Sequence, residues 1–120
     1  GLTVCAGSLS AGAHNNVPEL ARKYASRTKF VHLRSTDVLP GGNFKEASHL
    51  AGRAGIIDLV RTFQKENPSL PMRVDHAPLM LGDEKMGYNA GYSFHGRMLA
   101  LGQMEGVMAV VDREIAEGKI

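Results

Sequence analysis

Three side chains of types that bind metals stand at the ends of three apolar runs. Cys5 ends a run at the start of the chain, His32 lies near the end of a second run, and Asp75 follows a third. Thiolate, imidazole and carboxylate groups are all metal ligands in proteins. The separations of 27 and 43 residues are ones that successive strand–helix units supply. Because ligands bind at the carboxyl ends of the strands in parallel α/β folds, the pattern indicates a shared site.

Each of the three residues also has a structural explanation. A single cysteine beside a valine is more often a small core residue, and a histidine such as His32 in an apolar strand is readily explained by a hydrogen bond within the core. Asp75, which is followed by His76, can cap its strand and loop. A buried carboxylate without a partner is costly, however, so Asp75 is the hardest of the three to place in a core. Singly, Cys5 and His32 favour the structural explanation, whereas the three together favour a site.

The elements that would position these residues alternate along the chain. Apolar, β-prone runs predict strands at Leu2–Cys5, Lys29–Leu33 and Leu70–Val74. Helical spacing predicts helices at Pro18–Ser26 after an N-cap at Asn16, from Gly55 to Asn67-Pro68, and at Tyr92–Glu117 with a weak point between Gly102 and Gly106. Loops are expected at Ala6–Ala13, at Arg34–Gly52 with a turn at Pro40-Gly41-Gly42, and at Ala77–Gly91. This order predicts an α/β fold of about three parallel βα units.

The composition argues against several classes of protein. The chain has 120 residues, 43% of them hydrophobic, and a net charge of +2 without a run of basic residues, so it lacks a nucleic-acid-binding signature. No apolar segment approaches the roughly 20 residues that span a bilayer, and the glycines form no nucleotide-binding fingerprint. Cys5 is the only cysteine, which excludes an internal disulfide and fits a cytoplasmic setting. The chain begins in an apolar run without a leader, so we expect it to continue a longer reading frame.

Four segments resemble those of the mannonate dehydratase family. They are VCAGSLSAGAHNNVPELARKYASRTKFVHLRS at 4–35, NFKEASHLAG at 43–52, PMRVDHAP at 71–78 and AGYSFHGR at 90–97. Four motifs in the order of the family are far more specific than any one alone. The chain departs from the family at 75–78, at 89–92 and at 51–55, where it has DHAP, NAGY and AGRAG. These departures affect loops and leave the presumed metal ligands intact.

The resemblance implies that residues 1–120 are a C-terminal part of a (β/α)₈ TIM barrel of the xylose-isomerase-like superfamily, with Mn²⁺ or Fe²⁺ as cofactor. In that family a cysteine, two histidines and an aspartate hold the metal. Cys5, His32 and Asp75 match three of these, while the other histidine lies upstream in the family and has no match here. The residues matching the family's other functional positions are His76 and Tyr92, implied to be catalytic, and Arg34 and His49, implied to bind substrate.

The reaction implied by the resemblance is dehydration of D-mannonate to 2-keto-3-deoxy-D-gluconate, a step of hexuronate catabolism. Two alternatives remain open: a metal-dependent sugar isomerase on the same barrel, and an inactive fragment that acts as an assembly module. A complete barrel has eight strands and typically about 250 residues, and three strands are predicted here. We therefore expect little or no activity from the chain alone, and association with a second copy or with the rest of the barrel.

Overall fold

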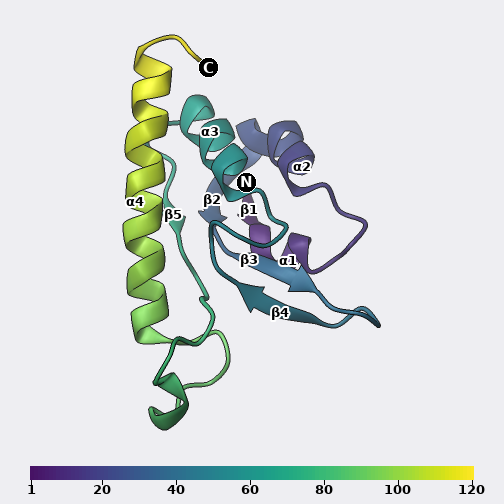
Figure 1. Cartoon of the computed structure of the whole chain (residues 1–120). Helices are drawn as coiled ribbons and strands as arrows, with labels where there is room; N and C mark the ends of the chain where they lie inside the picture. Colours follow the sequence, from purple (N-terminus) through teal and green to yellow (C-terminus); the bar gives the residue numbers. More distant parts are fainter.

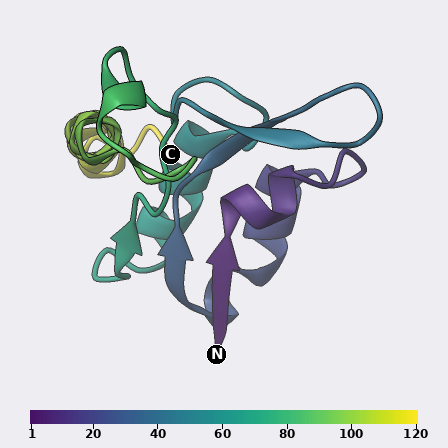
Figure 2. The same cartoon turned by 90° about the horizontal axis from the view of Figure 1, so that it is seen from below.

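A parallel three-stranded sheet brings the predicted ligand residues to one edge. The computed structural model describes residues 1–120. Strands β1 (Leu2–Cys5), β2 (Thr28–His32) and β5 (Met72–Arg73) form the sheet in the order β1–β2–β5. Cys5 pairs with His32, and His32 pairs with Arg73, so the carboxyl ends of the three strands meet (Figure 1 and Figure 2). The predicted parallel α/β arrangement is confirmed.

Three helices pack beside one another along this sheet. Helix α2 (Val17–Tyr24) starts at Asn16, whose side-chain oxygen accepts a hydrogen bond from the Glu19 backbone N–H, as predicted for an N-cap. Helix α3 (Ile56–Glu66) lies between α2 and α4 (Phe94–Ala116) (Figure 1). A single core cluster joins the sheet to the helices, and its members include Val31, Leu33, Ile56, Leu59, Val60, Phe63, Ala100, Met104 and Val111. None of the helices combines the length and apolarity needed to cross a bilayer.

An antiparallel hairpin replaces the loop predicted between the second strand and the second long helix. Strands β3 (Ser35–Val38) and β4 (Phe44–Ala47) pair from Ser35 opposite Ala47 to Val38 opposite Phe44. Gly41 and Gly42 have φ of 88° and 89°, and the predicted turn is the tip of this hairpin. The strands were missed because they are short and largely polar, so they show no apolar alternation.

Three further elements differ from the sequence prediction. Residues 6–10 form a short helix, α1 (Ala6–Ser10), where a loop was predicted. Strand β5 has only two residues of the predicted five, because the chain turns away at Asp75. Helix α4 runs unbroken through Gly102 and Gly106. A helix glycine costs only about 1 kcal/mol relative to alanine, which the packing of α4 against α3 offsets. Two 3₁₀ turns, η1 (Ala25–Arg27) and η2 (Asp83–Lys85), complete the chain.

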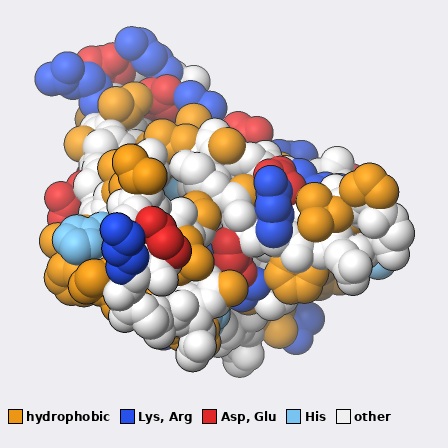
Figure 3. All heavy atoms as spheres, turned by 60° about the horizontal axis from the view of Figure 1, so that its bottom comes forward, with side chains coloured by type: hydrophobic (Ala, Val, Ile, Leu, Met, Phe, Trp, Pro, Cys, Tyr) orange, Lys and Arg blue, Asp and Glu red, His pale blue; other side chains and the backbone are white.

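Helix α4 exposes many large apolar side chains. Its apolar residues lie around the whole helix, and only part of them face α3. The exposed ones are Phe94, Met98, Leu99, Leu101 and Val110. Figure 3 shows hydrophobic side chains spread widely over one face of the molecule, with charged groups between them. Exposed apolar area on this scale is typical of surfaces that another protein segment covers.

We expect this exposed surface to make the chain self-associate. Light scattering on the purified chain at micromolar concentration should give a mass above the 12.9 kDa of one copy. Added salt should not reverse the association, because burial of apolar area drives it. A 12.9 kDa species that melts cooperatively and binds no hydrophobic dye would contradict this expectation.

Candidate metal centre

The three predicted ligands converge at the carboxyl edge of the sheet. One ligand atom from each of Cys5, His32 and Asp75 lies within 4.8 Å of the other two. The side chains of His32 and Asp75 are 23% and 10% exposed, and Nδ1 of His32 is 3.5 Å from Oδ2 of Asp75. Adjacent strand ends supply the first two residues, and the turn after β5 supplies the third. The Cys5–His32–Asp75 cluster is therefore both partly buried and open to solvent.

Asp75 reaches the cluster through an unusual backbone conformation. Its φ of 60° is the only positive value at a residue other than glycine. Aspartate tolerates this left-handed region better than most residues, but the conformation is still strained. The peptide before it is anchored by His49, whose Nε2–H donates to the Val74 carbonyl at 2.7 Å. Arg73 also approaches Asp75, with Nη2 3.4 Å from Oδ1. Strain of this kind at a side chain cluster is typical of functional sites.

His49 is buried, with 2% of its surface exposed. It matches a position that the resemblance implies to bind substrate. In the structure it lies behind Asp75, and its ring is hydrogen-bonded to the Val74 carbonyl. Burial lowers the pKa of His49 below its ordinary value of 6.5, although the hydrogen bond to Val74 partly opposes this shift.

This lowered pKa gives stability a defined pH dependence. Above pH 6.5 His49 is neutral in both states, and its contribution to stability is fully present. As the pH falls from 6.5 toward the lowered folded-state pKa, the unfolded chain takes up the proton first, so the free energy of unfolding decreases. Urea denaturation between pH 7.5 and 5 should show this decrease, and His49→Gln should reduce its slope. Equal slopes for the two proteins would rule out His49 as the source.

Cys5 is held by the first turn of α1 and by a neighbouring arginine. Its Sγ accepts hydrogen bonds from the backbone N–H of Ser8 at 3.5 Å and from the Ser8 hydroxyl at 3.2 Å. Nη1 of Arg34 lies 4.0 Å from the same sulfur. The Arg34 side chain crosses Gly7 so closely that a Cβ on this residue would overlap it. Because Gly7 has no side chain, the guanidinium of Arg34 can extend past it to the cluster.

Arg34 is engaged by two carboxylates. Its Nη2 is 2.9 Å from Oε1 of Glu46, and its Nη1 is 3.5 Å from Oδ2 of Asp75. The resemblance implies that Arg34 binds substrate, and the structure places it directly beside the Cys5–His32–Asp75 cluster. Sequence reasoning assigned no role to Glu46. The signal that would have found it is its place in the NFKEASHLAG motif, on a strand that was read as loop.

His76 and Tyr92 meet although 16 positions separate them. Their ring centroids are 4.6 Å apart with the planes at 79°. The loop between them returns through a parallel bridge of Ala77 with Tyr92, and His76 Nδ1 lies 3.3 Å from the Gly91 carbonyl, to which it donates. His76 Nε2 is 3.8 Å from Oδ2 of Asp75. The two residues that match the family's catalytic positions thus lie together and next to the cluster.

The other two histidines lie outside this arrangement. His14 is exposed in the loop between α1 and α2. His95 is exposed in the first turn of α4, where it packs edge-on against the Phe94 ring. Neither approaches the Cys5–His32–Asp75 cluster closely enough to share a metal ion with it.

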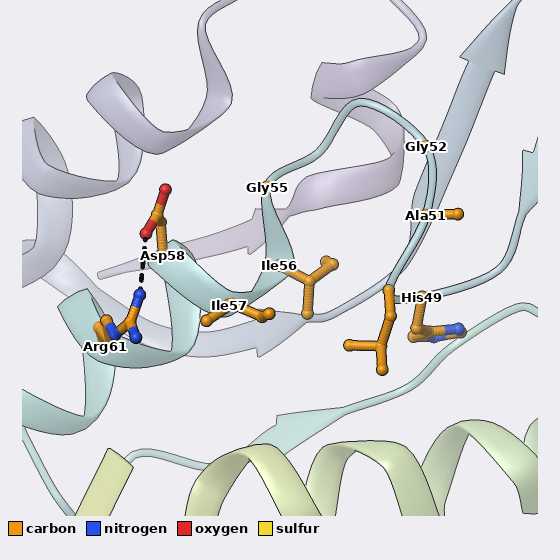
Figure 4. A pocket seen from close by; sticks show the side chains of 9 residues that line it. His49, Ala51, Gly52, Gly55, Ile56, Ile57, Asp58 and Arg61 are labelled. Carbon is orange, nitrogen blue, oxygen red and sulfur yellow. Dashed lines mark hydrogen bonds and ion pairs between the residues drawn. The ribbon is translucent and has the colours of Figure 1, made fainter. Parts of the chain in front are cut away.

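Several cavities border the strands and helices around the candidate site. A cavity of about 480 Å³ beside the cluster, between β5 and α4, is lined by Met72, Arg73, Val74, Asp75, Phe94, Arg97, Met98 and Leu101. A second cavity of about 280 Å³ lies between the segment after β4 and the start of α3 (Figure 4). Figure 4 shows the Asp58–Arg61 ion pair on its rim, and none of the three cluster residues lines it. The first cavity adjoins Asp75, and a separate cavity of about 320 Å³ between β1, α1 and α2 is lined by Cys5.

The chain is similar in sequence and in fold to known proteins. The family model described as D-mannonate dehydratase (UxuA) matches residues 1–117. "Mannonate dehydratase 2" of Agrobacterium fabrum and "Mannonate dehydratase" of Saccharophagus degradans are each 36% identical, over 96% and 93% of this chain and 31% of their own length. The crystal structure of mannonate dehydratase from Streptococcus suis superposes with a TM-score of 0.84 at 24% identity, over 97% of this chain and 34% of that one. The chain thus spans about a third of these relatives, and it belongs to the mannonate dehydratase family.

Proposed function

We propose that the chain supplies three metal ligands and both proton-transfer groups of a mannonate dehydratase active site. The reaction is the conversion of D-mannonate to 2-keto-3-deoxy-D-gluconate and water. The observation that carries the proposal is the convergence of the Cys5–His32–Asp75 cluster with the His76–Tyr92 pair. The rest of the active site comes from a further part of the barrel, since the chain spans about a third of its relatives.

The donor set fits a divalent transition metal. One thiolate, one imidazole and one carboxylate together form a mixed-donor set for a divalent transition metal, and the family resemblance favours Mn²⁺ or Fe²⁺ among these metals. Metal–ligand bonds of about 2.0–2.3 Å allow donors around one ion to lie up to roughly 4.6 Å apart. The cluster spans up to 4.8 Å, so a small side-chain rotation would bring the three donors to one ion. When bound, such an ion would stabilise negative charge on substrate oxygens and orient the sugar acid.

Proton transfer falls to His76 and Tyr92. Because His76 Nδ1–H donates to the Gly91 carbonyl, the neutral ring carries its free lone pair on Nε2. This nitrogen takes the C2 proton. The C2–H electrons form the C2–C3 double bond as the C3–O bond breaks. The departing oxygen takes the Tyr92 proton and leaves as water. The enol then takes the proton held by His76 at C3 and returns its own C2 hydroxyl proton to the Tyr92 phenolate, which gives the 2-keto acid and restores both residues.

The test is to graft the chain into a complete relative. Residues 1–117 would replace the matching segment of the Agrobacterium fabrum protein. The chimera would be loaded with Mn²⁺ and then given D-mannonate. We expect 2-keto acid to form, and Tyr92→Phe and His76→Gln to lower its rate by roughly 10²–10⁴-fold. Exposed His14→Gln is the matched control and should leave the rate unchanged. A folded, metal-binding chimera without turnover would refute the proposal, and ketose–aldose exchange would instead identify an isomerase.

A further inference from the structure

Glu46 has one charged partner, and that partner touches the candidate metal ligands. Oε1 of Glu46 lies 2.9 Å from Nη2 of Arg34, and the carboxylate side chain is only 15% exposed. Its other oxygen, Oε2, is buried without a hydrogen-bond partner. A carboxylate in this position loses most of its hydration, and a single ion pair with Arg34 offsets that loss. Arg34 is therefore its ion-pair link to the candidate metal ligands.

Arg34 brings a permanent positive charge to the place where a metal ion would bind. Its Nη1 is 3.5 Å from Oδ2 of Asp75 and 4.0 Å from Sγ of Cys5, so it contacts two of the three residues of the cluster. A guanidinium stays protonated at all relevant pH values. It is thus a built-in cation that can neutralise the same thiolate and carboxylate that a divalent ion needs.

The two contacts of Arg34 are unequal. The distance to Glu46 is 2.9 Å, while that to Asp75 is 3.5 Å, so the closer contact of the guanidinium is with the hairpin. Arg34 directly precedes β3 in the chain. Glu46 lies on β4, the strand that pairs with β3. Because Arg34 is joined directly to β3, its backbone has little conformational freedom while β3 and β4 are paired.

We propose that Glu46 is a positioning residue that restrains Arg34 so that its guanidinium does not compete with a divalent cation for Asp75 and Cys5. Without Glu46, the fork of Arg34 is free to pair fully with Asp75, an arrangement that guanidinium and carboxylate favour. The ligand atoms are then partly neutralised, and the metal affinity falls. This inference rests on the metal role proposed above for the Cys5–His32–Asp75 cluster.

The test is a Co²⁺ titration of the 120-residue chain, followed by the thiolate-to-cobalt absorption that reports Cys5 coordination. Glu46→Gln should weaken Co²⁺ binding roughly tenfold, as loss of a residue that orients metal ligands commonly does. Arg34→Met should bind at least as tightly as the unaltered chain. The double variant should bind like Arg34→Met alone, because Arg34 is the cation that Glu46 contacts and it is then absent. Glu66→Gln, at the exposed end of α3, is the matched control.

The double variant separates positioning from a merely structural role. If Glu46 only supports the fold, adding Arg34→Met will not restore affinity, and the inference is wrong. It is also wrong if Glu46→Gln binds Co²⁺ like the unaltered chain, or if Arg34→Met alone weakens binding tenfold. Should Glu46→Gln fail to fold by circular dichroism, the affinity of Arg34→Met still decides the matter. Absence of any cobalt–thiolate absorption from the unaltered chain would instead remove the proposed metal site itself.

Discussion

Asp75→Asn is expected to weaken Mn²⁺ or Co²⁺ binding by at least about 100-fold. The change removes the only carboxylate of the Cys5–His32–Asp75 cluster, and with it the charge that attracts the ion. Asparagine tolerates the left-handed backbone that this position requires, where φ is 60°, so the fold should survive. The loss would then report on ligation and not on unfolding. Binding is measured by titration of the purified chain.

The matched control for this change is Asp58→Asn. Asp58 is also an acidic residue with an arginine nearby, but its side chain is 58% exposed on α3 and lies outside the cluster. Its loss should leave metal binding unchanged. If Asp75→Asn retains the affinity of the unaltered chain, Asp75 is not a ligand, and the strained turn after β5 needs another explanation.

Phe63→Ala should remove about 3–5 kcal/mol from the free energy of unfolding. Phe63 is wholly buried on α3, in the core cluster that joins the helices to the sheet. Domains are usually stable by only about 5–15 kcal/mol, so this one cavity would take a large part of the total and leave many molecules unfolded. Urea denaturation followed by circular dichroism measures the loss.

The same substitution on the hairpin supplies the comparison. Phe44 is 48% exposed on β4, and Phe44→Ala should change the free energy of unfolding by no more than about 0.5 kcal/mol. Similar losses at both positions would mean that the core is not centred on α3, and that the exposed aromatic ring is covered by another copy in solution.

The elements that carry the metal ligands were predictable because apolar burial dictates them. The first strand was predicted with the observed limits, Leu2–Cys5, and α3 ends at Glu66, directly before the predicted Asn67-Pro68 stop. Each has an apolar pattern that only one secondary structure buries well. The same patterns place Cys5, His32 and Asp75 at the ends of three successive strands, which predicts that they lie together at the carboxyl edge of a parallel sheet.

The hairpin and its contribution to the site depend on backbone pairing and long-range polar contacts, and not on an apolar sequence pattern. Strand β4 pairs through backbone hydrogen bonds and carries Lys45 and Glu46, so nothing in its apolar content marks it as a strand. The left-handed turn at Asp75, which lets its carboxylate face His32, is set by tertiary contacts such as the His49–Val74 hydrogen bond. Long-range polar contacts of this kind leave no local periodicity, so the Arg34–Glu46 pair could not be derived from spacing.

The hairpin is firmly held at its base and free at its tip, which makes the tip suitable for accepting extra residues. At the base, Ser35 and Ala47 are buried, and the Ser35 hydroxyl accepts a hydrogen bond from the Ala54 backbone N–H. At the tip, a Cβ atom added to Gly41 or Gly42 would meet no other atom within 4 Å. Exposed turns of this sort tolerate insertion best. A peptide tag or a fluorescent reporter placed between these glycines would therefore leave the base of the hairpin, and Glu46 beside it, undisturbed.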